Sequence, residues 1–229
     1  MPDPASPRFR VAIFVSGGGS NMEALIRAAE KGGLPRAEIA LVICNRPDAG
    51  AVPRAQSHGI ETAVIASKGA ADQDFQASIL SALIERRIDV ICLAGYLKKV
   101  GSDIVQRYRG RILNIHPALL PRYGGAGMYG RFVHEAVLKA GDKESGCSVH
   151  LVDDEFDHGP VLAQRRVPVL TGDTPEGLAK RILEQEHQLY PQVLAQFCEQ
   201  LVAAQRHPGE GRGPETSTPL DSGFRRNDG

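Results

Sequence analysis

The hydrophobic residues of the chain recur with two spacings, and each spacing predicts a different element. Residues 9–15 are an apolar run rich in β-branched and aromatic side chains, which indicates a buried strand. Downstream of them, Met22, Leu25, Ile26 and Ala29 have the spacing of a helix. The same alternation predicts further strands at 38–44, 61–66, 88–96 and 111–117, and helices at 49–58, 72–87 and 104–108.

The pattern changes in the last third of the chain. Residues 146–154 and 160–170 are two consecutive strand-like runs, which we expect to form an antiparallel pair. A long helical pattern follows at 174–205, with Thr174 and Pro175 suited to its first turn. The sequence therefore predicts an α/β fold: a doubly wound, mostly parallel sheet, an antiparallel C-terminal strand pair and a long C-terminal helix.

Composition divides the chain into three parts. It has 229 residues, 42% of them hydrophobic, which is enough for one substantial core. We expect one domain at 9–205, preceded by a flexible N-terminus at 1–8. Residues 206–229 are rich in Gly, Pro and charge, so we expect a disordered tail.

Charge and cysteine usage narrow the function classes. Lysines and arginines number 27 and so do the acidic residues, so no overall basic field favours nucleic acid. No run resembles a signal peptide or a membrane span. We expect a cytoplasmic protein without nucleic-acid or membrane partners. The four cysteines are Cys44, Cys92, Cys147 and Cys198, and no two of them have the short spacing of a metal-binding pair. We expect them to be buried thiols in a reducing compartment rather than disulfides or zinc ligands.

A glycine-rich loop, Ser-Gly-Gly-Gly-Ser-Asn at 16–21, joins the first strand to the first helix. Such a junction directs free backbone N–H groups and the positive helix end at one point, where phosphate binds well. We expect Ser20 or Asn21 to be the N-cap. Met22 and Gly19 break the dinucleotide and P-loop fingerprints, respectively. A tight turn without a ligand remains the alternative.

Two polar residues mark the end of the strand at 111–117. Asn114 and His116 are two residues apart, so their side chains lie on the same face. Ligands of open parallel sheets bind at the carboxyl ends of strands, where the glycine loop also lies. An amide donor and an imidazole can polarise a carbonyl and hold an oxyanion. The alternative is a satisfied polar cluster before a Pro turn.

An acid-rich segment at 153–157 supplies carboxylates, which could form a site together with the amide of Asn114 and the imidazole of His116. A carboxylate beside His116 would raise the pKa of its imidazole. The residues alone leave open which acid this is: Asp153, Asp154, Glu155 or Asp157. A metal site is a further alternative, although its ligands would be irregularly spaced: His116, His134, His150 and Asp157.

Five motifs occur in an order that resembles the folate-dependent formyltransferases. They are "SGGGSN", "LAGY", "NIHPALLP", "SVHLVDDEFDHGP" and "EQEHQLYP", and the resemblance runs from about Phe9 to Gln205. Within that family, "SGGGSN" matches the branch that formylates glycinamide ribonucleotide. The resemblance implies an enzyme of purine biosynthesis that takes the formyl group from 10-formyltetrahydrofolate and needs no metal. It implies a monomer or homodimer with small-molecule substrates.

The resemblance also implies roles for individual residues. The catalytic residues would be Asn114, His116 and Asp157, with Asp157 keeping His116 protonated. The ribonucleotide would be bound by Gly19, Ser20, Asn21 and Glu186. The folate would be bound by Leu97, Lys98, Lys99, Val100, Asn114 and Asp154. Roles for His134, His150 and the 121–135 loop are left open.

The chain departs from the family at a few positions. Gly18 replaces an Asn of the loop, and "LKKV" at 97–100 replaces a more usual Met-Arg-Ile-Leu type of segment. Related alternatives are a methionyl-tRNA formyltransferase, a formyltetrahydrofolate deformylase or a non-catalytic nucleotide-binding module. The first two usually carry a further domain, and the last would have lost the Asn, His or acid.

Overall fold

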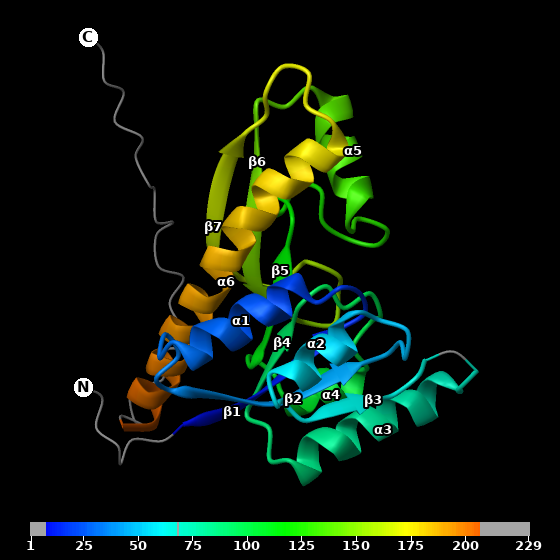
Figure 1. Ribbon diagram of the computed structural model, residues 1–229, viewed down its shortest axis with the longest axis vertical. Coiled ribbons are helices and arrows are strands. Elements are labelled where there is room, and N and C mark those ends of the chain that lie inside the picture. Colours follow the sequence, from blue (N-terminus) through cyan, green and yellow to red (C-terminus); the bar gives the residue numbers. More distant parts are fainter. Residues whose placement is uncertain (1–7, 68, 207–229) are drawn as a thin grey trace.

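A computed structural model describes residues 8–67 and 69–206 of the chain (Figure 1). The strands of the described part are β1 Phe9–Val15, β2 Ala37–Cys44, β3 Thr62–Val64, β4 Val90–Leu93, β5 Ile112–His116, β6 Glu144–Leu151 and β7 Val161–Pro168. The helices are α1 Ser20–Glu30, α2 Ala51–Ser57, α3 Asp72–Glu85, α4 Ser102–Arg107, α5 Arg131–Ala140 and α6 Pro175–Arg206.

All seven strands form one sheet in the order β3-β2-β1-β4-β5-β6-β7. The first five are parallel neighbours, with β1 paired to both β2 and β4. β6 runs antiparallel to β5, and β7 runs antiparallel to β6. The predicted fold class is confirmed, including the antiparallel pair and the long last helix.

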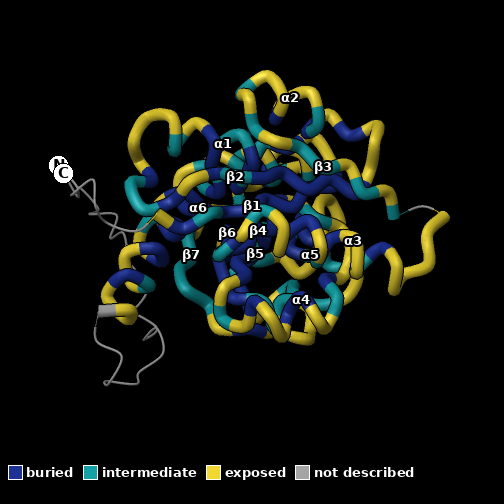
Figure 2. Tube along the Cα trace, turned by 90° about the horizontal axis from the view of Figure 1, so that it is seen from below, coloured by how far each residue is buried: buried dark blue, intermediate teal, exposed yellow. Residues whose placement is uncertain are grey.

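Two hydrophobic cores cover the two faces of the sheet. The odd positions of β1, such as Val11 and Ile13, pack with α1 and α6. The even positions, Ala12 and Phe14, pack with α3 and α4. Figure 2 shows the central strands in dark blue and the outer sides of the helices in yellow. Burial on both faces is the reason why these strands are near-continuous apolar runs.

The last helix joins the two halves of the sheet. α6 lies along α1, β6 and β7 and carries the largest fully buried side chain, Tyr190. Its hydroxyl lies 3.1 Å from the carbonyl oxygen of Leu93 and 3.0 Å from that of Leu113. One O–H group from α6 thus ties the ends of β4 and β5 together.

The predicted bounds differ from the observed ones mainly at element ends. The strand expected at 88–96 is confined to β4, because Gly95 turns the chain with a φ of 73°. α5 was not predicted, since its short apolar stripe follows a glycine-rich loop. All four cysteines are buried free thiols, as expected. The predictions for the first seven residues and for 207–229 lie outside the described residues.

Candidate active site

A cavity of about 510 Å³ opens at the carboxyl ends of β4 and β5. Nine of the residues that the sequence selected line it: Asn21, Leu97, Lys98, Lys99, Val100, Asn114, His116, Asp157 and Glu186. Within the described part of the chain, its lining does not include Gly19, Ser20 or Asp154. Ser20 lines a shallow neighbouring groove, and Asp154 is exposed. The cavity therefore brings together most, but not all, of the expected residues.

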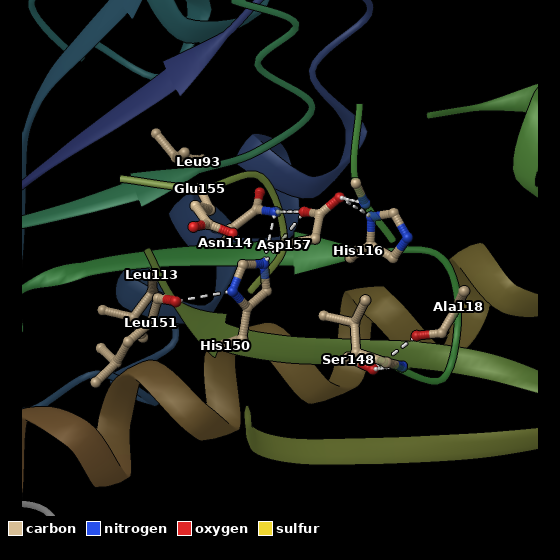
Figure 3. A network of polar contacts seen from close by, with 12 residues as sticks. Leu93, Leu113, Asn114, His116, Ala118, Ser148, His150, Leu151, Glu155 and Asp157 are labelled. Atoms are coloured by element: carbon tan, nitrogen blue, oxygen red, sulfur yellow. Dashed lines mark hydrogen bonds and ion pairs between the residues drawn. The ribbon is translucent and has the colours of Figure 1, made fainter. Parts of the chain in front are cut away.

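Four side chains meet in this cavity, as Figure 3 shows. Asn114 and His116 lie on the same face of β5, and Asn114 is paired in register with His150 of β6. The Asn114 Nδ2 atom lies 3.0 Å from His150 Nε2 and 3.3 Å from Asp157 Oδ1. His116 Nδ1 and Asp157 Oδ2 are 3.4 Å apart. The residue pattern left the acid partner of His116 open and the family resemblance implied Asp157, which is the carboxylate that contacts the ring.

Both nitrogens of the buried His116 ring face protein acceptors. Nε2 lies 2.7 Å from the carbonyl oxygen of Tyr123, so it must carry the proton and donate. Nδ1 faces Asp157, to which it can donate only when the ring is charged. This arrangement fixes the ring orientation.

The expected raised pKa of His116 is wrong for the ligand-free protein. Burial disfavours the imidazolium and lowers the pKa of His116. The charge of Asp157 and the hydrogen bond to Tyr123 act in the opposite direction without outweighing it. At neutral pH the ligand-free ring is therefore mainly neutral, and further negative charge close to it would favour its protonation.

Asp157 stays ionised in spite of its surroundings. Burial would raise the pKa of its carboxyl, but His150, His116 and the Gly125 N–H together hold that pKa below its usual value. The Gly125 nitrogen lies 3.1 Å from Asp157 Oδ2. Asp157 also has a positive φ of 55°, which is uncommon for a residue other than glycine. The site thus pairs a neutral imidazole with a fixed anion.

The glycine loop starts α1 in a different way from the one expected. Gly19, at a φ of 78°, is the N-cap, and no side chain caps the helix, so the prediction of Ser20 or Asn21 is wrong. The first helical bond runs from the Glu23 N–H to the Gly19 carbonyl. The N–H groups of the first turn consequently lack helical partners, which leaves them available to an anion.

Asn21 and Glu186 connect the glycine loop to the cavity. Asn21 Nδ2 donates to Glu186 Oε2 at 2.7 Å, although the two residues are far apart in the sequence. Both are buried, and burial raises the pKa of Glu186 while the Asn21 hydrogen bond opposes the shift. The Asn21 Oδ1 atom has no partner among the described residues. The pair is a polar end of the cavity with unused hydrogen-bonding capacity.

Another part of the cavity wall is formed by the 97–100 segment. Leu97 and the two lysines are exposed and Val100 is buried. Gln76 of α3 holds this segment, accepting from the Gly101 N–H at 2.9 Å and donating to the Lys99 carbonyl at 3.1 Å. The Lys99 ammonium lies 5.9 Å from the centre of the exposed Phe156 ring. This part of the wall is apolar with a cationic rim.

Sequence reasoning assigned no role to several groups of the site. His150 contacts Asn114. The sequence signal for it was its position two residues after Ser148 in a strand, which places both polar side chains on the same face. The Tyr123 carbonyl and the Gly125 N–H are backbone groups, which carry no sequence signal. His134 of α5 also lines the cavity, is 4% exposed, and has an unpartnered Nδ1. In the described ranges, no three His, Cys, Asp or Glu side chains are arranged to hold a metal.

The burial of His134 predicts a loss of stability in acid. Burial, and secondarily His116, lowers the pKa of His134. Below about pH 6.5 the unfolded chain takes up this proton before the folded one, so stability is full above that pH and falls below it. We expect His134→Gln to flatten the pH dependence of the unfolding free energy by up to about 1.4 kcal/mol per pH unit, the limit for one proton. Urea unfolding between pH 7 and 5 measures this, and a slope equal to that of the wild type would contradict it.

Comparisons with known proteins point to one family. Residues 9–194 match the family model described as formyl transferase. The chloroplastic phosphoribosylglycinamide formyltransferase of Arabidopsis thaliana is 42% identical over 197 residues, which are 85% of this chain and 67% of the plant protein. The phosphoribosylglycinamide formyltransferase of Haemophilus influenzae is 39% identical, over 83% of this chain and 87% of that protein.

A solved structure agrees with these matches. The crystal structure of phosphoribosylglycinamide formyltransferase from Brucella melitensis superposes on this chain with a TM-score of 0.77 at 48% identity. The alignment covers 83% of this chain and 96% of the Brucella chain. No helix in residues 8–67 and 69–206 is both long and apolar enough to cross a membrane.

Proposed function

The chain belongs to the formyl transferase family, and we propose that it transfers the formyl group of 10-formyltetrahydrofolate to the amine of phosphoribosylglycinamide in purine biosynthesis. The relatives from A. thaliana, H. influenzae and B. melitensis are named for this acceptor. The observation that carries the proposal is the cluster of Asn114, His116 and Asp157 in a cavity with a polar end and an apolar end.

The acceptor fits the polar end of the cavity. Its phosphate would lie next to Asn21 at the first turn of α1, where the backbone N–H groups of Gly19, Ser20 and Asn21 have no helical partners. Glu186, already held by Asn21, would accept hydrogen bonds from sugar hydroxyls. The amine of the acceptor would then reach toward Asn114 and His116.

The donor fits the part of the cavity that the 97–100 segment lines. Leu97 and Val100 offer apolar surface to the folate ring system, and Lys98 and Lys99 offer positive charge to its carboxylates. Asp154, which we expected to contact the folate, is exposed next to two residues that do line the cavity, Asp153 and Glu155. Its role stays a prediction that depends on movement of the 153–157 segment.

The chemistry needs a stabilised oxyanion and a moving proton. The neutral amine attacks the formyl carbon, and the formyl oxygen gains the negative charge. The Asn114 amide and the His116 imidazolium would donate to that oxygen in place of Asp157, which they face at 3.3 and 3.4 Å in the ligand-free site. When the bond to the folate nitrogen breaks, the proton lost by the amine reaches that nitrogen by way of His116 or a water. Holding both substrates in one cavity supplies proximity.

The lowered pKa of His116 indicates when, in this mechanism, the ring gains its charge. The ring is neutral in the empty site, and Asp157 already lies 3.4 Å from its Nδ1. Negative charge that develops on the formyl oxygen would add to that of Asp157 and favour the imidazolium. His116 would thus become charged as the oxyanion forms.

Further properties follow the family resemblance. We propose that the enzyme works in the cytoplasm as a monomer or homodimer, without nucleic-acid partners and without a metal. Its buried free thiols are compatible with a reducing compartment.

A direct absorbance assay tests the proposed reaction. Purified protein is mixed with 10-formyldideazafolate, and the deformylated product is followed by absorbance with and without phosphoribosylglycinamide. We expect product only when the acceptor is present. Product without the acceptor would indicate a deformylase, and no product in either case would leave only a binding function.

Replacing Gly19 tests the phosphate loop. An alanine Cβ would lie 2.8 Å from the Cβ of Ala51, and the φ of 78° disfavours any side chain. We expect Gly19→Ala to raise KM for the acceptor about tenfold, because the first-turn N–H groups shift, while KM for the donor stays within about twofold. Steady-state kinetics with each substrate varied measures this.

Gly32→Ala is the matched control, since Gly32 has a φ of 77° with open space around its Cβ. It carries the same backbone strain at the far end of α1. An equal rise in acceptor KM in both variants would show that strain, not loop position, is responsible.

A further inference from the structure

His116, Ser148 and Gln164 form one row across three strands. His116 of β5 is paired in register with Ser148 of β6, and Ser148 is paired with Gln164 of β7. Directly opposite residues of antiparallel strands have side chains on the same face. The row therefore places two uncharged polar side chains beside the proposed catalytic histidine.

Ser148 and Gln164 bind the turn that follows His116. The Ser148 hydroxyl donates to the Ala118 carbonyl at 2.6 Å and accepts from the Leu120 N–H at 3.0 Å. Gln164 Nε2 donates to the Leu120 carbonyl at 2.9 Å and to the Ser148 hydroxyl at 2.8 Å. The contacts between Ser148 and the turn are visible in Figure 3. One amide and one hydroxyl thus satisfy three backbone groups of the turn.

The same turn ends at the residue that orients His116. The Tyr123 carbonyl accepts from His116 Nε2, and Tyr123 has a positive φ of 57°. The Tyr123 hydroxyl donates to Asp142 Oδ2 at 2.7 Å. The turn is therefore anchored at Leu120 by Gln164 and at Tyr123 by Asp142.

One side of this turn borders a cleft, although Ala118 and Leu120 are buried. The cleft, of about 490 Å³, is lined by residues 119–123 together with Gln164 and Ser145. Where a cleft replaces packed side chains, hydrogen bonds determine the position of the backbone. Loss of the Gln164 amide would leave Leu120 held on this side by Ser148 alone.

We propose that Gln164 is a positioning residue for formyl transfer: its amide fixes the 117–123 turn so that the Tyr123 carbonyl holds the His116 ring toward the substrates. The proposal rests on the proposed role of His116. Gln164 touches neither substrate in this proposal and acts through the turn. Its replacement should therefore change turnover and the state of the His116 ring, but not substrate binding.

The test replaces Gln164 with Met, which keeps the length but removes the donor, and with Leu, which is shorter, also removes the donor and adds no charge near His116. We expect kcat to fall about tenfold while both KM values stay within about twofold. We also expect the His116 imidazole, followed by NMR in the ligand-free protein, to titrate at lower pH, because the Tyr123 hydrogen bond raises its pKa. The other titratable groups near the ring are unchanged in these variants: Asp157, His150 and His134.

Gln192→Met is the matched control. Gln192 is exposed on α6, accepts from Arg165, and has no contact with the turn. We expect wild-type kcat and an unchanged His116 titration in this variant.

Each outcome decides the proposal. Wild-type kcat with an unchanged His116 titration in a folded Gln164 variant would overturn it, and so would a lower kcat without a change in titration. If Gln164→Met does not fold, the same two measurements on Gln164→Leu decide the proposal. If the wild type transfers no formyl group, the proposed function fails, and the titration still decides whether Gln164 positions the ring.

Discussion

We expect His116→Ala to lower kcat for formyl transfer by about a hundredfold or more and to leave the fold intact. The variant removes an oxyanion donor, and one such donor is worth on the order of 3 kcal/mol at comparable sites. It also removes the group proposed to pass the proton to the folate nitrogen. His116 contacts the Tyr123 carbonyl and Asp157 at the cavity, outside the two apolar cores, so Ala should not unfold the sheet. Steady-state kinetics and the unfolding midpoint measure both expectations.

His58→Ala is the control for this variant. His58 ends α2, where it pairs with Glu30 at the surface, and it lines no part of the cavity. We expect its kcat to equal that of the wild type. Near-normal transfer by purified His116→Ala would falsify the assignment of His116 as an oxyanion donor.

We expect Asp157→Asn to lower kcat by about a hundredfold through the charge state of His116. The carboxylate favours the imidazolium, and burial already lowers the pKa of that ring. An amide at 157 would remove the favourable charge and could donate to the unprotonated Nδ1, which would stabilise the neutral ring. The pKa of His116 should therefore fall further. Kinetics of this variant relative to the wild type at several pH values measures the effect.

The sign of the pH dependence follows from that shift. Well above both pKa values the two imidazolium fractions differ by a constant factor. The deficit in kcat relative to the wild type should therefore be constant there and should shrink as the pH is lowered below the wild-type pKa, which lies under 6.5. Asp103→Asn, an exposed acid on α4, controls for loss of one negative charge. A deficit that does not shrink below the pKa of wild-type His116, as followed by NMR, would show that Asp157 acts by geometry rather than by charge.

The fold was largely predictable because its signals are local. Burial on both faces makes β1, β2 and β4 continuous apolar runs, and the helices between them have one apolar stripe each. The antiparallel pair was recognisable because β6 and β7 follow each other without an intervening helix. α5 was missed, since neither its length nor its flanking loop distinguishes it from a connection.

The site was predictable only in part, for a physical reason. Asn114 and His116 could be predicted as site residues from the sequence, because a two-residue spacing at the end of a strand places their side chains on the same face. That Asp157 is their acid partner depends on how the 153–157 segment folds back, and the residues alone left four acids open. Ser148 and Gln164 act through backbone groups of a turn, and their register across β5–β7 is a long-range property. The N-cap of α1 was wrong for a different reason: Gly19 begins the helix through its backbone conformation, without a side-chain cap.

The position of α6 at the end of the domain has a consequence for how the protein is made. α6 supplies much of one core and the hydroxyl of Tyr190 that bridges β4 and β5. While a ribosome adds roughly 5–20 residues per second, only α1 and its neighbours cover the face of the sheet against which α6 packs, and the part that α6 supplies is missing until the chain has grown past residue 200. This face of the nascent sheet is therefore only partly covered for several seconds, and its apolar side chains are a natural target for chaperones during that interval.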